Sequence, residues 1–396
     1  TGASTNNHMK RGRQDDDDDD EAPGPSDEAE AAGPSAAAGA QKPSKADLAV
    51  RLALGAMPCA EMYEKSFMHR DHVTHIVCTT SDFLVTGSRD GQVKFWKKMQ
   101  SGIEFVKHFR AHLAPISCMA ATSDGSLLAT IAADKAIKVF DVLSFDMINW
   151  VKLEFAPSVC EWIGGGSSRS RPMLAVADVD SAEIRLFDAS GEGSIVSTVR
   201  IHSAPVVQLK LSLAKSVMIS IDARGVIEYW TTDGDHAAPK DVSFRYKTDT
   251  DLYALAKARA VPTSLAISPN GEHFAVTASD FKVRLFRYSS GKCIRSFDES
   301  YDAMNQLQKD GDDTYRLEAF DFGRRMAVER EYRAAGSSAP PSNCIFDRSG
   351  RFLIYPSVVG IKVISVASSR LARLLGKVEN TERFGALALF QGRAEL

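Results

Sequence analysis

Short runs of alternating apolar and polar residues recur along this chain, and six of them share one four-residue pattern. Each of these tetrads holds an apolar residue, a charged residue, a second apolar residue and a bulky one: Val93–Trp96, Ile137–Phe140, Ile184–Phe187, Ile227–Trp230, Val283–Phe286 and Ile361–Ile364. Their first residues lie 44, 47, 43, 56 and 78 positions apart. A period of about 40–45 residues with aromatic strand ends is typical of propeller blades, each built from about four short strands. The pattern therefore predicts an all-β propeller.

The first two repeats predict how strands and turns alternate within a blade. Strands are expected around Ile76–Cys78 and Phe83–Thr86, and a turn at Ser88–Gly91 leads into Gln92–Trp96. Asp-Gly is a strong signal for a tight turn because glycine accepts a positive φ at little cost. The second repeat copies this spacing with strands at Ile116–Cys118, Leu127–Thr130 and Ile137–Phe140.

The chain divides into a tail and a repeat region. Residues 1–58 are rich in Asp, Glu, Ala, Gly, Pro and Ser and are expected to be a disordered acidic tail. Residues 59–396 are expected to form the propeller, with insertions at about 232–261 and 298–342, the second part-helical. Leu387–Phe390 is similar to the first strand of a seventh unit, and 61–68 to an outer strand that closes the ring. A seven-bladed type whose last blade is incomplete in this chain is therefore predicted.

Charge and cysteine content add further limits. Residues 1–50 hold 5 Lys or Arg and 11 Asp or Glu, a net charge of −6, while the whole chain carries −3, so the remaining residues carry +3. The run at 15–21 is interpreted as a solvating tail, with docking to a basic partner as the alternative. A charge of +3 is far from a nucleic-acid footprint, so no direct nucleic-acid binding is expected. The six cysteines lack paired spacing and are interpreted as small buried strand residues in a reducing compartment, with disulfides or a zinc site as the alternative.

No membrane or secretory segment is evident. No run approaches the roughly 18 apolar residues of a membrane span, and no charged-then-apolar leader opens the chain. A soluble, intracellular protein is expected.

The repeats resemble those of WD-repeat proteins, which carry a hydrogen-bonded set of His, Ser or Thr, Asp and Trp. The first repeat matches with His69, Thr86, Asp90 and Trp96. The second keeps His112, Thr130 and Asp134 but ends in Phe140, so that its set cannot close. The fourth keeps His202, Ser220 and Trp230, with Asp222 displaced by two positions. We call the positions that match this hydrogen-bonded set the set residues: His69, Thr86, Asp90, Trp96, His112, Thr130, Asp134, His202, Ser220 and Trp230.

Longer segments resemble one family, the peptidylprolyl isomerase domain and WD repeat-containing proteins. They are Tyr63–Lys98, Tyr246–Leu255, Phe322–Glu331 and Gly376–Gly392. The resemblance implies a nuclear, spliceosome-associated protein with a cyclophilin domain after the propeller. That domain is absent from this chain, so the resemblance carries over no catalytic isomerase position.

Each candidate site residue has a structural role as its alternative. His69, His72 and His75 are spaced by three, but imidazoles at that spacing in a strand or loop do not converge on one ion, so no metal or cofactor is expected. Asp90 and Asp134 occupy turns, where each carboxylate fixes its own loop. Arg89 precedes the turn Asp, a position that in WD-repeat proteins usually contacts partners. Ser168–Arg171 is similar to the arginine–serine dipeptides of splicing factors, but four residues are too few for such a segment, and it is interpreted as a loop.

Three functional hypotheses follow. The first is a protein-interaction scaffold within pre-mRNA splicing complexes, with protein partners and no small-molecule substrate. The second is a targeting module whose parent protein catalyses peptidyl-prolyl cis-trans isomerisation, although residues 1–396 themselves are not expected to be an enzyme. The third is a phosphopeptide or substrate receptor that uses Arg89.

Overall fold

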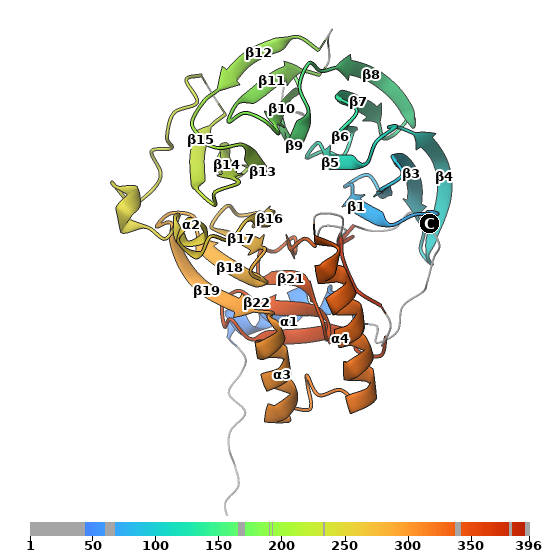
Figure 1. Cartoon of the computed structure of the whole chain (residues 1–396), viewed down its shortest axis with the longest axis vertical. Helices are drawn as coiled ribbons and strands as arrows, with labels where there is room; N and C mark the ends of the chain where they lie inside the picture. Colours follow the sequence, from blue (N-terminus) through green and yellow to red (C-terminus); the bar gives the residue numbers. More distant parts are fainter. Residues whose placement is uncertain are drawn as a thin grey trace, which may run out of the picture. The chain divides into compact units, whose positions relative to one another are not determined.

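Six antiparallel sheets surround a common centre (Figure 1). The computed structural model describes residues 44–59, 68–164, 171–189, 191, 193–232, 234–336, 342–379 and 382–392. Within each sheet the strands follow one another in chain order. The first strand of each sheet lies innermost and the last lies at the rim, which is the arrangement of propeller blades.

The first three blades have four strands each. Blade one contains β1 (Val73–Cys78), β2 (Phe83–Ser88), β3 (Gln92–Lys98) and β4 (Ile103–Arg110). Blade two contains β5 (Ile116–Ala121), β6 (Leu127–Ala132), β7 (Ala136–Asp141) and β8 (Asp146–Lys152). Blade three contains β9 (Pro157–Ile163), β10 (Met173–Asp178), β11 (Ile184–Asp188) and β12 (Ile195–Val199).

The last three blades are less uniform. Blade four has three strands in the described residues: β13 (Val206–Ser212), β14 (Val217–Asp222) and β15 (Ile227–Thr231). Blade five contains β16 (Pro262–Ile267), β17 (His273–Ala278), β18 (Lys282–Arg287) and β19 (Lys292–Asp298). Blade six contains β20 (Ile345–Phe346), β21 (Phe352–Ser357), β22 (Gly360–Ser365) and β23 (Leu371–Leu375).

The tetrads occupy one equivalent position in all six blades. They fall in β3, β7, β11, β15, β18 and β22, which are the third strands of their sheets. Five of these strands are hydrogen-bonded on both sides, and β15 pairs only with β14 in the described residues. All six pack against neighbouring blades, which explains the two apolar residues and the bulky end of each tetrad. The predicted propeller and the role of the tetrads within it are confirmed.

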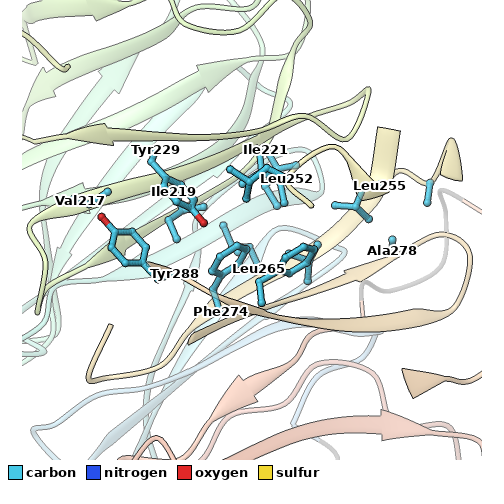
Figure 2. Close-up of a cluster of buried hydrophobic side chains, with 14 residues drawn as sticks. Val217, Ile219, Ile221, Tyr229, Leu252, Leu255, Leu265, Phe274, Ala278 and Tyr288 are labelled. Atoms are coloured by element: carbon cyan, nitrogen blue, oxygen red, sulfur yellow. The ribbon is translucent and has the colours of Figure 1, made fainter. Parts of the chain in front are cut away.

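Apolar clusters fill the contacts between consecutive blades. Between blades four and five, strands β14 and β15 meet β16, β17 and β18 in a cluster that includes Ile219, Tyr229 and Phe274 (Figure 2). The Tyr229 and Tyr288 rings stack at 5.0 Å between centroids, and Phe274 and Phe286 stack at 4.9 Å. Comparable clusters join blades one to two, two to three, three to four and five to six. The core is therefore radial, divided into layers between sheets.

A seventh blade is not present in the described residues, so the seven-bladed expectation is corrected to six blades. The predicted strand Leu387–Phe390 is irregular chain instead. The segment nevertheless contacts both blade six and blade one. Asn343, just before β20, exchanges hydrogen bonds with the Leu387 backbone at 2.6 and 2.9 Å, and Lys98 Nζ of β3 lies 5.9 Å from the Phe390 ring centroid. In the part of the chain that the structure describes, the Leu387 backbone bonds to the Asn343 side chain and is not part of a sheet. The predicted outer strand at 61–68 lies almost wholly outside the described residues.

The boundary of the tail also needs correction. Residues 45–55, assigned above to a disordered segment, form helix α1 (Lys45–Gly55). Val50 and Leu54 of this helix pack with Met57 against Phe352 and Val363 of blade six. Burial of this apolar face stabilises a helix inside a sequence whose overall composition resembles the tail.

Both predicted insertions contain helices. The first includes the short helices η1 (Lys247–Asp249) and α2 (Ala254–Ala258), and the second forms α3 (Tyr301–Asp310) and α4 (Ala319–Ala334). Ser300 caps α3 by accepting from Ala303 N, and Gly311 ends it at φ +71°. Met304 of α3 and Met326 of α4 pack on Val358 and Val359 of blade six. Across the described ranges, no helix is long and apolar enough to cross a membrane.

Gly91→Ala is expected to destabilise the protein by at least about 2 kcal/mol, because the backbones of blades one and two approach each other closely at Gly91. Its φ is +79°, and a Cβ there would overlap the carbonyl oxygen of His112. Urea unfolding measures the effect. Gly234→Ala is the matched control, since its φ is also positive but no atom lies within 4 Å of its added Cβ. Equal costs for the two variants would contradict the close approach of the blades.

Candidate interaction surface

Blade one joins three of its four predicted set residues through one hydroxyl. His69 Nε2 lies 2.7 Å from Thr86 Oγ1, and Trp96 Nε1 donates to the same oxygen at 2.8 Å. Asp90 instead accepts from Gln92 N at 3.1 Å and shapes the turn. His69 Nδ1 is buried and finds no hydrogen-bond partner among the described residues. Burial, and then the charge of Lys94, lowers the pKa of His69.

Blade two joins its own three residues. His112 Nε2 lies 2.9 Å from Thr130 Oγ1, and His112 Nδ1 lies 3.0 Å from Asp134 Oδ2. Phe140 occupies the place of the tryptophan, so no indole N–H reaches Thr130. Burial lowers the pKa of His112, although Asp134 acts in the opposite direction. A buried imidazole that links the loop before β5 to β6 and to the turn after β6 has a structural role.

Blade four shows that a displaced aspartate still reaches its histidine. Ser220 Oγ lies 2.7 Å from His202 Nε2 and accepts from Trp230 Nε1 at 3.2 Å. Asp222 Oδ2 lies 3.4 Å from His202 Nδ1. Burial acts to raise the pKa of Asp222, but the nearby His202 and the hydrogen bonds that Asp222 accepts from the Val226 and Arg224 backbone N–H groups outweigh burial and lower it. Sequence spacing alone had left Asp222 out of this set.

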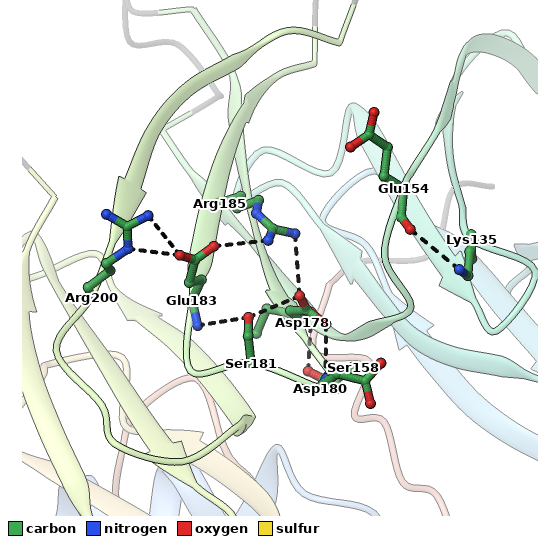
Figure 3. Close-up of polar contacts among 10 residues, drawn as sticks. Lys135, Glu154, Ser158, Asp178, Asp180, Ser181, Glu183, Arg185 and Arg200 are labelled. Atoms are coloured by element: carbon green, nitrogen blue, oxygen red, sulfur yellow. Dashed lines mark hydrogen bonds and ion pairs between the residues drawn. The ribbon is translucent and has the colours of Figure 1, made fainter.

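Blade three holds a different network that sequence reasoning missed. Arg185 lies between Asp178 and Glu183, at 3.4 and 2.9 Å, and Arg200 donates to Glu183 at 2.8 Å (Figure 3). Ser181 donates to Asp178 at 2.9 Å. The one sequence feature that could have indicated this network is Arg185, the charged member of its tetrad.

The charged tetrad residues of blades one, four, five and six also have fixed partners. Lys94 donates to Met68 O at 2.6 Å, and Lys362 donates to Glu299 Oε1 at 2.6 Å. Glu228 accepts from Lys247, and Arg284 pairs with Asp280. In each of these blades, the charged tetrad residue therefore contacts a different kind of partner.

The three closely spaced histidines turn to separate partners. His72 bonds to Asp71, and His75 Nδ1 lies 2.9 Å from Thr74 Oγ1, while His69 bonds to Thr86. Within the described ranges, no group of three or more His, Cys, Asp or Glu side chains is placed to hold a metal ion. Of the segment Ser168–Arg171, only Arg171 lies in the described residues.

Arg89 lies in an exposed turn at the end of β2. Its equivalents in blades two, three and five are Ala133, Val179 and Ser279, and all four are exposed. Only one of these four positions is therefore cationic.

Helix α4 is anchored to the propeller by buried charges. Glu329, 1% exposed, accepts from Arg333 at 2.8 Å and from Arg383 at 2.5 Å. The Arg333 guanidinium also lies 3.5 Å from the Phe281 ring centroid and 3.8 Å from that of Tyr301. Arg325 donates to three backbone carbonyls, those of Val358, Gly376 and Lys377. Sequence reasoning missed these residues because Arg383 lies 54 positions from Glu329.

A cavity of about 620 Å³ opens between blades five and six beside α4. Its walls include Val261, Phe281 and Val358, and Glu299 and Arg333 also line it. This volume lies in the range of about 300–1,000 Å³ that is common for ligand pockets. Exposed Ser279, the equivalent of Arg89, lies on the same wall.

The rim strand of blade two exposes apolar side chains. Ile148 and Trp150 of β8 are 52% and 61% exposed and, being two residues apart, lie on one side of the strand. Asp146 of β8 forms an ion pair with Lys107 of β4 at 2.9 Å beside them. We call Ile148 and Trp150 the β8 strip. Apolar side chains grouped on a surface are typical of protein contacts.

Comparison with known proteins identifies propeller families. Residues 60–183 match the family described as VPS11-like, N-terminal beta-propeller, and residues 256–287 match WD domain, G-beta repeat. The second match covers β16, β17 and β18.

Longer matches come from curated relatives. Peptidylprolyl isomerase domain and WD repeat-containing protein 1 of Homo sapiens is 45% identical over 349 residues, which is 87% of this chain and 53% of the relative. Peptidyl-prolyl cis-trans isomerase CYP71 of Arabidopsis thaliana is 42% identical over 86% of this chain and 54% of its own length. Peptidyl-prolyl cis-trans isomerase 9 of Schizosaccharomyces pombe is 36% identical, with 85% and 56% covered. The chain thus spans about half the length of these relatives.

Proposed function

The chain is a homologue of the peptidylprolyl isomerase domain and WD repeat-containing proteins over its WD-repeat region, and from this premise we propose that it acts as a nuclear protein-interaction scaffold in pre-mRNA splicing complexes. The β8 strip is the observation that carries the interaction role. A rim strand that exposes Trp150 and Ile148 offers rigid apolar contact area, which binds partners at a small ordering cost. The nuclear and splicing assignments come from the family resemblance.

Partner capture from nuclear extract tests this proposal. The full chain on beads should retain splicing proteins. The double variant Ile148→Ser, Trp150→Ser should capture at least about tenfold less of them, which corresponds to a loss of about 1.4 kcal/mol of binding free energy. Leu213→Ser is the matched control, since Leu213 is also 61% exposed but lies between β13 and β14. Failure to capture any splicing protein would overturn the proposed role, and equal capture by the double variant would exclude the β8 strip.

Catalysis in this family is proposed to belong to another part of the parent protein. Relatives named as isomerases are about twice as long as the segment matched here. The chain would then direct a proline isomerase to its substrates. In a proline-isomerisation assay, the chain alone should leave the uncatalysed rate unchanged, whereas acceleration would contradict this division of labour.

A phosphopeptide receptor is the less favoured alternative. Phosphate recognition usually relies on several converging arginines, whereas Arg89 is the only cation among the four exposed equivalent positions. Arg89→Glu is expected to leave partner capture unchanged, and a selective loss of phosphorylated partners would favour the receptor.

A further inference from the structure

The central cavity of the ring carries a cluster of thiols and charges that the interaction role does not use. This cavity of about 480 Å³ is lined by the innermost strands of the blades. Cys118 of β5 and Lys210 of β13 line it and are partly exposed. Cys160 and Glu161 lie on the neighbouring strand β9, with Cys160 fully buried.

Contacts join these groups across blades two, three and four. Cys118 Sγ lies 3.5 Å from Cys160 O, and Cys118 packs against the apolar cluster that contains Cys160. Lys210 Nζ lies 2.5 Å from Glu161 Oε2. From β1, His75 also faces the cavity. The two cysteines are therefore neighbours on adjacent strands, with Cys118 lining the cavity and Cys160 buried behind it.

The surroundings assign different protonation states to the two cysteines. The hydrogen bond from the Cys160 thiol is the largest cause that lowers the pKa of Cys118 to about 7. Burial and the charge of Glu161 oppose this, and the charge of Lys210 supports it. The same hydrogen bond, together with burial, raises the pKa of Cys160 well above its ordinary value. Burial lowers the pKa of His75 to about 4, so His75 is neutral near pH 7.

We propose that Cys118 is a modification site for hydroperoxides and that Cys160 is its resolving thiol, which converts the modified residue into a disulfide between blades two and three. The Cys118 thiolate attacks a peroxide oxygen, an S–O bond forms, the O–O bond breaks, and the hydroxide that leaves is protonated to water. Cys160 then attacks the sulfenic acid sulfur, an S–S bond forms, and a second water leaves with the Cys160 proton. Two thiols are oxidised and one hydrogen peroxide is reduced.

Alkylation with iodoacetamide, read by peptide mass spectrometry across a pH series, tests the thiol. Cys78 is the matched control because it lines the same cavity and is partly exposed, but burial raises its pKa to about 11. Labelling of Cys118 should have its midpoint near pH 7 and, at about pH 8, be about tenfold faster than that of Cys78. Equal midpoints for the two residues would overturn the proposal.

Peroxide treatment of the folded chain tests the resolving step. Wild type should give a peptide linking Cys118 to Cys160 that dithiothreitol reverses. Cys160→Ala should instead give Cys118 sulfenic acid, trapped by dimedone, whereas Cys78→Ser should behave as wild type. Circular dichroism checks that each variant is folded, and wild type alone remains decisive if Cys160→Ala unfolds. Disulfides elsewhere, or none, in the folded wild-type chain would overturn the proposal.

Discussion

Trp230→Ala is expected to lower the free energy of unfolding by about 3–5 kcal/mol, among the largest effects of any single truncation in the chain. Trp230 is 0% exposed and packs in the cluster between blades three and four, with Leu186 and Met218. Its removal leaves a cavity between two sheets that are held by the rest of the ring. The loss also frees the Ser220 hydroxyl from its indole partner. Urea unfolding followed by circular dichroism measures the effect.

Two further variants separate the causes. Trp230→Phe keeps most of the apolar volume but removes the N–H, and should cost about 1–2 kcal/mol from the lost hydrogen bond to Ser220 and the smaller ring. Trp150→Ala is the matched control, because this tryptophan is largely exposed on β8, and should change stability by less than about 0.5 kcal/mol. A loss for Trp150→Ala as large as that for Trp230→Ala would contradict the radial core.

Lys362→Met is expected to cost about 3–5 kcal/mol near neutral pH, because it leaves Glu299 buried without its cation. Glu299 is 8% exposed, and its Oε1 accepts from Lys362 at 2.6 Å and from Tyr355 OH at 3.1 Å. The double variant Glu299→Leu, Lys362→Met removes both charges and should recover most of the loss. Lys107→Met is the control, since the Lys107–Asp146 pair is exposed and is expected to contribute less than about 1 kcal/mol.

The same variant should acquire a pH dependence of known sign. Burial raises the pKa of Glu299, and Lys362 opposes that rise. Without Lys362 the folded-state pKa rises further above the unfolded value. The folded protein then binds a proton that the unfolded chain releases, so stability is highest below the unfolded pKa and falls as pH rises through the folded one. Lys362→Met should therefore lose less stability at about pH 5 than at about pH 8. A penalty that is independent of pH would contradict the buried pair.

The sequence predicted the repeated strands well because their physics is local. A tetrad such as Val93–Trp96 encodes alternation, a buried bulky end and a turn before it, and all of these act within one hairpin. His69, Thr86 and Trp96 could be grouped for the same reason, since they lie within one blade. Asp90 was assigned to the same set by spacing, but it bonds to Gln92 in its own turn instead.

Features that depend on contacts between distant segments could not be predicted. Helix α1 exists because Val50 and Leu54 pack on blade six, about 300 positions away. The pairing of Glu329 with Arg383 depends on where α4 lies against blade six. Leu387–Phe390 has the alternation of a strand, but its backbone bonds to the Asn343 side chain instead of to a neighbouring strand.

Native-state amide hydrogen exchange, resolved by peptide, is the most direct test of the propeller on which this account depends. Peptides that contain the tetrads of β3, β7, β11, β18 and β22 should exchange most slowly and to a similar extent, because each of these third strands is hydrogen-bonded on both sides. The tetrad of β15 is left out of the comparison, because in the described residues β15 pairs only with β14. Peptides from the rim strands β4, β8, β12, β19 and β23 should exchange faster. If any of these five tetrads exchanged as fast as a rim strand, the equivalent placement of the repeats around one centre would be contradicted.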